Sequence, residues 1–269
     1  MPSLFLRLTR RAQTEWRWRM AKRATSVEMH WLKRPKLDLS DKVCLFVTYS
    51  RQPRLKPDCF RQARVWRARG LKFILVAITD NPASFMHDAA QTDQLDGFVI
   101  RPNLGHDFGA WAGAICDLPE LRDVSLLVTA NDSIVGPLRS FDDFLDRMDR
   151  IPGDLIGVTE SCEARRHYQS YMLFFRPNAL RSDVFDRFWR NVRIVERTDV
   201  VIHCELRLLR RFEQGGLTSG VLFPAIDSSC PTNRHYRRLI DEGFPYVKRQ
   251  LLRDRQFCRS QDALASLGG

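Results

Sequence analysis

The feature that most constrains the fold is an alternation of short apolar runs with amphipathic stretches, which begins at Val43 and continues through most of the chain. The apolar runs, rich in β-branched residues, predict strands at 43–49, 72–79, 97–101, 125–130, 155–159 and 170–175. The intervening stretches predict helices at 58–69, 108–116, 142–149, 183–192 and 201–214. Strands that alternate with helices favour an α/β protein with a Rossmann-type, mainly parallel sheet flanked by helices.

A basic segment precedes this pattern, because residues 1–37 carry ten Lys and Arg side chains and only two acidic ones. Within it, apolar residues recur at spacings of three and four, the period of an amphipathic helix: Trp16, Met20, Ala24, Val27 and Trp31. Such a helix would either cap the core or lie on an anionic membrane surface. We therefore expect a basic amphipathic extension at 1–40, one domain at 41–256 and a C-terminal tail at 257–269.

The net charge limits the classes of partner that the protein can bind, and the cysteines indicate its cell compartment. The net charge of +11 favours anionic partners: nucleotide diphosphates, acidic lipid headgroups or nucleic acid. No nucleic-acid-binding motif occurs, so we expect no nucleic acid partner. The seven scattered cysteines contain no C-x-x-C pair, and no uncharged run approaches the roughly 20 residues of a membrane span. A cytoplasmic protein that is peripheral on the inner face of the cytoplasmic membrane fits best.

Polar residues follow the predicted strands at the places where a parallel sheet collects its ligands. Tyr49 ends the first strand, Asp80 and Asn81 follow the second, and two longer clusters follow the third and fourth, at 103–107 and 131–133. The sequence lacks a Walker loop, a G-x-G-x-x-G and an H-E-x-x-H motif, which argues against P-loop enzymes, dehydrogenases and metalloproteases.

The two longer clusters each leave two interpretations open. Asn103, Gly105 and Asp107 lie in a glycine-containing loop that leads to Trp111, and Asp107 is placed as a helix N-cap. The loop either caps the helix or binds a nucleotide. Asn131 and the following Asp132 are either an Asx-turn or a site where a carboxylate meets Mg²⁺ or Mn²⁺ and a diphosphate.

Two further segments carry groups suited to sugar chemistry. His167, Gln169 and Tyr171 would alternate onto one face of a strand, where they either bind sugar hydroxyls or are simply solvated. Glu205 lies in an amphipathic helix that ends at a Gly-Gly pair, so partial burial would raise its pKa toward that of a general base. The alternative for Glu205 is a salt bridge to a neighbouring arginine, Arg207 or Arg210.

Together these segments resemble the rhamnan synthesis protein F family of polysaccharide glycosyltransferases. The resemblance runs from about Leu45 to Asp254 and rests on several motifs in a fixed order, at 103–111, 131–137, 157–160, 167–171, 188–189, 202–216 and 246–252. Several motifs in order are more specific than any one of them. The resemblance implies a GT-A fold and transfer of rhamnose or a related deoxysugar from dTDP-rhamnose to a glycan or lipid-linked glycan acceptor.

The resemblance also implies a role for each candidate residue. The base of the nucleotide would contact Asp80 and Asn81, with Tyr49 and Trp111 also on the donor side. The nucleotide or donor sugar would contact Asn103, Gly105, Asp107 and Asn131, and the acceptor or sugar would contact His167, Gln169 and Tyr171. Asp132 would hold the metal, and Glu205 would deprotonate the acceptor hydroxyl.

Two departures from the family pattern bear on this interpretation. The usual Asp-x-Asp is replaced by Asn131-Asp132-Ser133 with a single carboxylate, which leaves the metal open. His106 stands where an arginine is usual, and a histidine clamps a diphosphate less firmly at neutral pH. Such changes would also suit a non-catalytic GT-A-like subunit of a membrane-associated polysaccharide assembly complex, the alternative function. The stereochemistry, inverting or retaining, is not fixed by the sequence.

Overall fold

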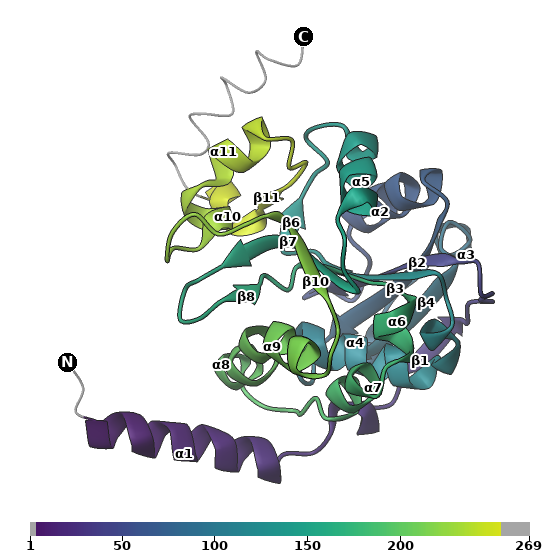
Figure 1. The fold of residues 1–269 in the computed structure, drawn as a ribbon. Coiled ribbons are helices and arrows are strands. Elements are labelled where there is room, and N and C mark those ends of the chain that lie inside the picture. Colours follow the sequence, from purple (N-terminus) through teal and green to yellow (C-terminus); the bar gives the residue numbers. More distant parts are fainter. Residues whose placement is uncertain (1–3, 254–269) are drawn as a thin grey trace.

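The computed structural model of the protein describes residues 4–253 and shows one large sheet between two layers of helices (Figure 1). Four neighbouring strands of the sheet run parallel in the order β4-β3-β2-β5. Their bounds are Lys42–Tyr49 for β2, Leu71–Thr79 for β3, Gly97–Pro102 for β4 and Leu126–Asn131 for β5. The parallel half of the sheet agrees with the prediction to within one or two residues at each strand end.

The other half of the sheet mixes directions. β9 (Met172–Phe175) pairs antiparallel with β5 on one side and with β7 (Leu155–Ser161) on the other. β10 (Ser219–Phe223) then adds parallel to β7, while β8 (His167–Tyr168) pairs antiparallel with it. Among the strands that the structure describes in this sheet, β2, β3, β4, β5, β7 and β10 run in one direction, which confirms an α/β fold with a mainly parallel sheet.

The helices cover the two faces because strand side chains alternate. Val43, Leu45 and Val47 of β2 point into one core, and the intervening Cys44 and Phe46 point into the other. The first core is covered by α4 (His106–Asp117), α7 (Asp183–Arg190) and α9 (Leu206–Gln214). The second is covered by α2 (Pro57–Ala68) and α5 (Phe141–Arg150). Short helices α3 (Ala89–Thr92) and α6 (Pro177–Arg181) complete the crossovers.

The predicted basic leading helix is present, but its predicted extent through Trp31 is wrong. The leading helix, α1, spans Leu4–Met20, and a short 3₁₀ turn, η1 (Ala24–Ser26), follows it. His30–Lys33 then forms β1, which pairs antiparallel with β4 at the edge of the sheet. Tertiary hydrogen bonds interrupt the helix, since the Ala24 N–H donates to the Val192 carbonyl at 2.8 Å. The α1 helix lies at the bottom of Figure 1, beside α8 (Arg197–Val200).

The sequence pattern predicts no helix or strand in the segment after β10. It contains α10 (Pro231–Arg234), α11 (Tyr236–Asp241) and η5 (Arg249–Arg253), together with β11 (Val247–Lys248), which pairs with β6 (Ile134–Val135). The division into an extension, a domain and a tail stays a prediction, and its tail at 257–269 lies outside the described residues. No helix within residues 4–253 is long and apolar enough to cross a membrane.

Candidate active site at the carboxyl edge of the sheet

The four parallel strands bring the predicted polar groups to one edge. Because β2, β3, β4 and β5 are neighbours that run the same way, their carboxyl ends meet there. At the ends of β2 and β3, the Tyr49 hydroxyl donates a hydrogen bond to Asp80 Oδ2 at 2.6 Å. Asp80 and Asn81 are exposed beyond β3. The sequence-predicted nucleotide side therefore presents a carboxylate, an amide and a phenol to solvent.

The β4–α4 loop is shaped by two glycines and a buried arginine. Gly105 has a φ of +81°, which favours glycine, and a side chain at Gly109 would meet the Leu104 carbonyl at 2.6 Å. The fully buried Arg101 donates to the carbonyls of Leu104 (3.0 Å) and Gly109. Burial lowers the pKa of Arg101 to about 10, because the charged guanidinium is held away from water.

Asp107 is not the N-cap of α4. Gly105 takes that position, and Asp107 lies in the first turn, where the helix dipole favours a carboxylate. Its Oδ2 accepts a hydrogen bond from Asn131 Nδ2 at 2.8 Å, which joins the β4–α4 loop to the end of β5. Burial, followed by the charge of Asp132, raises the pKa of Asp107 to about 7, and Glu205 adds to the effect.

Asp132, directly after β5, is surrounded by cationic and hydroxyl groups. Its Oδ2 accepts hydrogen bonds from Thr48 Oγ1 at 2.7 Å and from the Lys56 ammonium at 2.5 Å. Arg249 donates to the Asp132 carbonyl at 2.9 Å and to Asp58 Oδ2 at 3.2 Å. A carboxylate so placed next to a lysine and an arginine lies in a region that attracts phosphate.

The side chains around Asp132 do not supply enough ligands for a metal ion. One oxygen of Asp132 is already occupied by the Lys56 ammonium, which supplies the positive charge that a cation would bring. In the part of the chain that the structure describes, no three His, Cys, Asp or Glu side chains gather closely enough to hold an ion. Mg²⁺ and Mn²⁺ need several oxygen ligands, so most of them would have to come from elsewhere.

Glu205 lies at the end of a π-helical turn, η4 (Val201–Glu205), that joins α8 to α9. Such turns are rare and often occur at functional sites. Glu205 Oε2 accepts a hydrogen bond from Ser170 Oγ at 2.9 Å, and Oε1 lies 3.8 Å from His167 Nε2. Because Arg207 instead pairs with Glu15, the predicted alternative of a salt bridge from Glu205 to Arg207 is wrong.

Three predicted ligand-binding residues are buried and engaged within the protein. Trp111 is fully buried and donates its indole N–H to the Leu45 carbonyl at 3.2 Å. Gln169 and Tyr171 both bond to Thr159 Oγ1, at 2.8 and 2.9 Å. Such burial suits packing beneath the site, and a contact of these three side chains with a ligand stays a prediction. The predicted alternation of His167, Gln169 and Tyr171 along one strand is wrong, because residues 169–171 form a turn between β8 and β9.

Two cavities lie beside the residues that neighbour Asp107 and Asp132. A cavity of about 550 Å³ is lined mainly by residues that follow β2, from Ser50 to Pro57, and Lys56 is among them. A second, of about 530 Å³, is lined by Asn103, His106 and residues of α1. Within the described residues, the buried side-chain oxygen of Asn103 has no hydrogen-bond partner. A polar atom left unpaired beside a cavity is available to a ligand.

Sequence reasoning missed the groups that position the candidates. Lys56, Ser170 and Arg249 contact residues far away in the sequence, and only the tertiary structure reveals these contacts. Arg101 instead acts within its own loop, on the carbonyls of Leu104 and Gly109. One signal was present, because Arg101 interrupts the end of an otherwise apolar strand run at 97–101.

A family model described as rhamnan synthesis protein F matches residues 76–266, which is most of the chain. The chain belongs to the rhamnan synthesis protein F family. This confirms the resemblance that the ordered motifs indicated.

Individual proteins that match this family member share about a quarter of their aligned residues with it. The virulence protein VirA of Vibrio anguillarum is 26% identical over 196 aligned residues, and the match covers 59% of this chain and 63% of VirA. The uncharacterised protein y4gN of Sinorhizobium fredii is 27% identical over 185 residues, 65% of this chain and 47% of y4gN. The chain thus spans less than two thirds of the length of these relatives.

Solved structures give only remote likenesses to this family member. A nucleotide-diphospho-sugar transferase from Desulfovibrio desulfuricans G20 is 14% identical, with a TM-score of 0.39, and the match covers 83% of this chain and 96% of that one. The WbbM bifunctional glycosyltransferase is 11% identical, with a TM-score of 0.33, and the match covers 71% and 39%. The fold described above stands on the strand pairing of this chain.

Proposed function

We propose that this protein is a glycosyltransferase that moves a sugar from a nucleotide-sugar donor to a glycan or lipid-linked glycan acceptor in bacterial cell-surface polysaccharide synthesis. The family points to rhamnose or a related deoxysugar, given as dTDP-rhamnose. The observation that carries the proposal is the meeting of Asp107, Asn131 and Asp132 at the strand ends with Glu205, which lies close enough to raise the pKa of Asp107. Such a site holds separate groups for a donor and for a base.

In the proposed reaction, Glu205 acts as the general base. It takes the proton of the acceptor hydroxyl while that oxygen bonds to the anomeric carbon, and the nucleoside diphosphate leaves with the electrons of the broken bond. Ser170, hydrogen-bonded to Oε2, would hold the carboxylate in place. Lys56 and Arg249, both at Asp132, would stabilise the charge that grows on the leaving diphosphate. A divalent cation stays a prediction, and no step depends on it.

The test is a thermal-shift measurement with dTDP and dTDP-rhamnose, with and without Mn²⁺, on the wild type, Asp132→Ala and Glu205→Gln. A ligand at a hundred times its Kd stabilises the folded state by about 2.7 kcal/mol. We expect wild type and Glu205→Gln to be stabilised. Asp132→Ala should lose the part of that gain that depends on Mn²⁺, because Asp132 is the predicted metal ligand. Only wild type should turn over the donor, with a loss of at least a hundredfold in Glu205→Gln.

The matched control is Glu120→Gln, because Glu120 is exposed in the 3₁₀ turn η3 (Pro119–Arg122), outside the candidate site. It should behave like wild type in every arm. If a folded wild type is stabilised by no nucleotide, the transferase proposal fails, and the non-catalytic subunit of a polysaccharide assembly complex becomes the better account.

The proposed place of action is the cytoplasm, at the inner face of the membrane. The proposal rests on the charge of +11 and on two exposed apolar side chains of α1, Trp16 and Met20. Aromatic and basic side chains together suit an anionic bilayer surface. A lipid-linked acceptor would be met there.

A further inference from the structure

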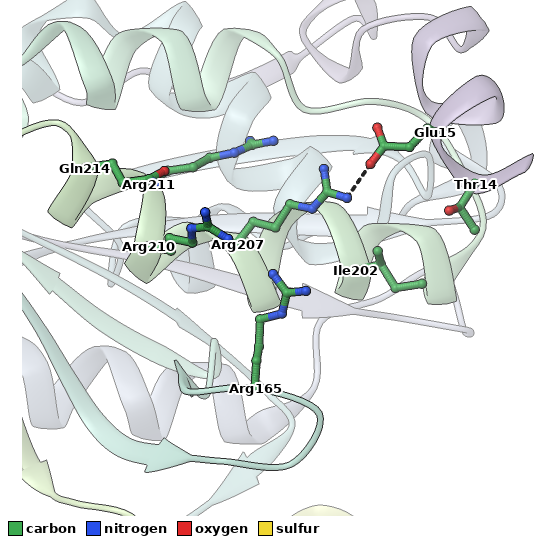
Figure 2. Close-up of a pocket in the computed structure, with 8 residues that line it drawn as sticks. All are labelled: Thr14, Glu15, Arg165, Ile202, Arg207, Arg210, Arg211 and Gln214. Carbon is green, nitrogen blue, oxygen red and sulfur yellow. Dashed lines mark hydrogen bonds and ion pairs between the residues drawn. The ribbon is translucent and has the colours of Figure 1, made fainter. Parts of the chain in front are cut away.

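A third cavity, lined mostly by polar side chains, lies between α1 and α9, apart from the strand ends. Its volume is about 500 Å³, and four of its lining side chains are arginines: Arg165, Arg207, Arg210 and Arg211. Figure 2 shows Arg165 reaching from the β7–β8 loop toward Arg207 and Arg210, while Glu15 of α1 faces Arg207. We call this set the arginine pocket.

The positive charge of the arginine pocket is mostly unbalanced. Arg207 forms an ion pair with Glu15. Arg165, Arg210 and Arg211 have no carboxylate at ion-pair distance among residues 12–252, whose side chains the structure describes. The neighbouring Arg166 is different, since Glu160 and Glu213 both pair with it, at 2.6 and 2.9 Å. The pocket therefore carries an excess of three guanidinium groups.

Such a cluster costs free energy unless an anion joins it, because like charges at short range repel. Arg211 shows the cost, since burial, with the charge of Arg207 adding to it, lowers the pKa of its guanidinium. Its guanidinium also lies 5.7 Å from the centre of the Phe188 ring, which fixes its position. Guanidinium groups bind phosphate through two parallel N–H donors, so several of them around one cavity match a phosphate or diphosphate.

The pocket is connected to the candidate base by one short segment. His167 Nδ1 donates to the Arg165 carbonyl at 2.8 Å, and its Nε2 lies 3.8 Å from Glu205 Oε1. Ile202, which lines the pocket, belongs to the same π-helical turn as Glu205. An anion in the pocket would therefore bind beside the turn that carries Glu205.

We propose that the arginine pocket binds a phosphate or diphosphate group of the acceptor and so holds the acceptor hydroxyl near Glu205. The assignment to the acceptor rests on the proposed function, because only a transferase needs an acceptor. The pocket's affinity for a phosphate group follows from its own charge and geometry. An acceptor with a phosphate-linked carrier is thereby favoured over a neutral glycan.

The experiment is a calorimetric titration of the full chain with inorganic pyrophosphate, in the presence of saturating dTDP to fill the donor site. Arg165→Gln and Arg210→Gln are the test variants, because both side chains are exposed and their loss should leave the fold intact. Arg64→Gln is the control, since Arg64 is exposed on α2, which covers the other face of the sheet. We expect each test variant to raise the Kd for pyrophosphate roughly tenfold and the control to leave it unchanged.

A vesicle arm separates a discrete phosphate site from a general attraction to lipid headgroups. Phosphatidylglycerol vesicles should bind Arg165→Gln and Arg210→Gln as well as they bind Arg64→Gln. The proposal is overturned if wild type does not bind pyrophosphate, if the test variants bind it normally, or if they lose vesicle binding more than the control does. Failure of dTDP to bind would count against the proposed function alone, and the titration would then be run without it.

Discussion

At the scale of single residues, Asp107 has the most unusual environment of the site. The sequence places it at a helix start, where a carboxylate is ordinarily ionised. In the folded protein, burial and the nearby Asp132 and Glu205 raise its pKa from 3.8 to about 7. A carboxyl group with a raised pKa can hold a proton near neutral pH and donate a hydrogen bond to a ligand oxygen.

This environment predicts a pH-dependent effect of Asp107→Asn. Because the folded state binds the Asp107 proton more tightly than the unfolded chain, the wild type loses stability as the pH rises from about 4 through about 7. The neutral amide does not titrate and can still accept the hydrogen bond of Asn131. We compare the free energy of unfolding of Asp107→Asn with that of wild type at two pH values. We expect this difference to shift in favour of the variant by about 1 kcal/mol between pH 4 and pH 8, allowing for solvent screening. Urea unfolding at the two pH values would test this, and equal differences would contradict it.

At the scale of elements, the docking of α1 is the feature that local pattern could not give. Trp18 stacks on His203 of η4 with ring centres 4.5 Å apart, and Arg17 donates to both oxygens of Asp199 in α8, at 2.7 and 3.0 Å. The Asp199 side chain is almost fully buried. α1 is therefore held against the helix that carries Glu205, and it forms one wall of the arginine pocket.

Removal of Arg17 should destabilise the protein because it leaves the Asp199 carboxylate buried and unpaired. Arg17 is half-exposed, so we expect Arg17→Ala to lower the free energy of unfolding by less than the loss of one partner from a fully buried pair would. Arg19→Ala is the control, since Arg19 is exposed in the same turn of α1. Denaturant unfolding measures the effect, and the double variant Arg17→Ala/Asp199→Asn should recover part of the loss. Equal stability of the two arginine variants would show that the pair contributes nothing.

At the scale of the whole molecule, charge and exposed apolar surface lie together on α1. Trp16 and Met20 are 65% and 68% exposed, and arginines 17 and 19 flank them. A chain with a net charge of +11 is attracted to anionic surfaces from a distance, and exposed apolar side chains can then insert.

Trp16→Ser and Met20→Ser should therefore weaken binding to phosphatidylglycerol vesicles at low salt by about threefold to tenfold each. Leu39→Ser is the matched control, because Leu39 is also 68% exposed but lies outside α1. Cosedimentation measures the binding, which should fall for every variant as salt is added. Pyrophosphate affinity should be unchanged in both α1 variants, since neither residue lines the arginine pocket. Loss of vesicle binding in the control to the same extent would contradict a role for α1.

The sequence by itself determined what depends on local periodicity. Strand and helix patterns come from residues close together in the chain, so β2 to β5, α2 and α4 could be placed from them. The parallel order then put Asp80 and Asp132 at one edge, because carboxyl ends of parallel strands meet. The ordered motifs were sufficient for the family.

Tertiary structure alone decided what depends on contacts between distant segments. It ended the leading helix at Met20, because the chain beyond it pairs with the 192–194 loop. It buried Trp111 and Tyr171 in the two cores. A motif does not show whether an aromatic side chain packs inside the protein or faces a ligand. It also paired Asp132 with Lys56, 76 residues away, and gathered the arginine pocket from α1, the β7–β8 loop and α9. Charge balance at a site is a property of its neighbours in space, which periodicity does not encode.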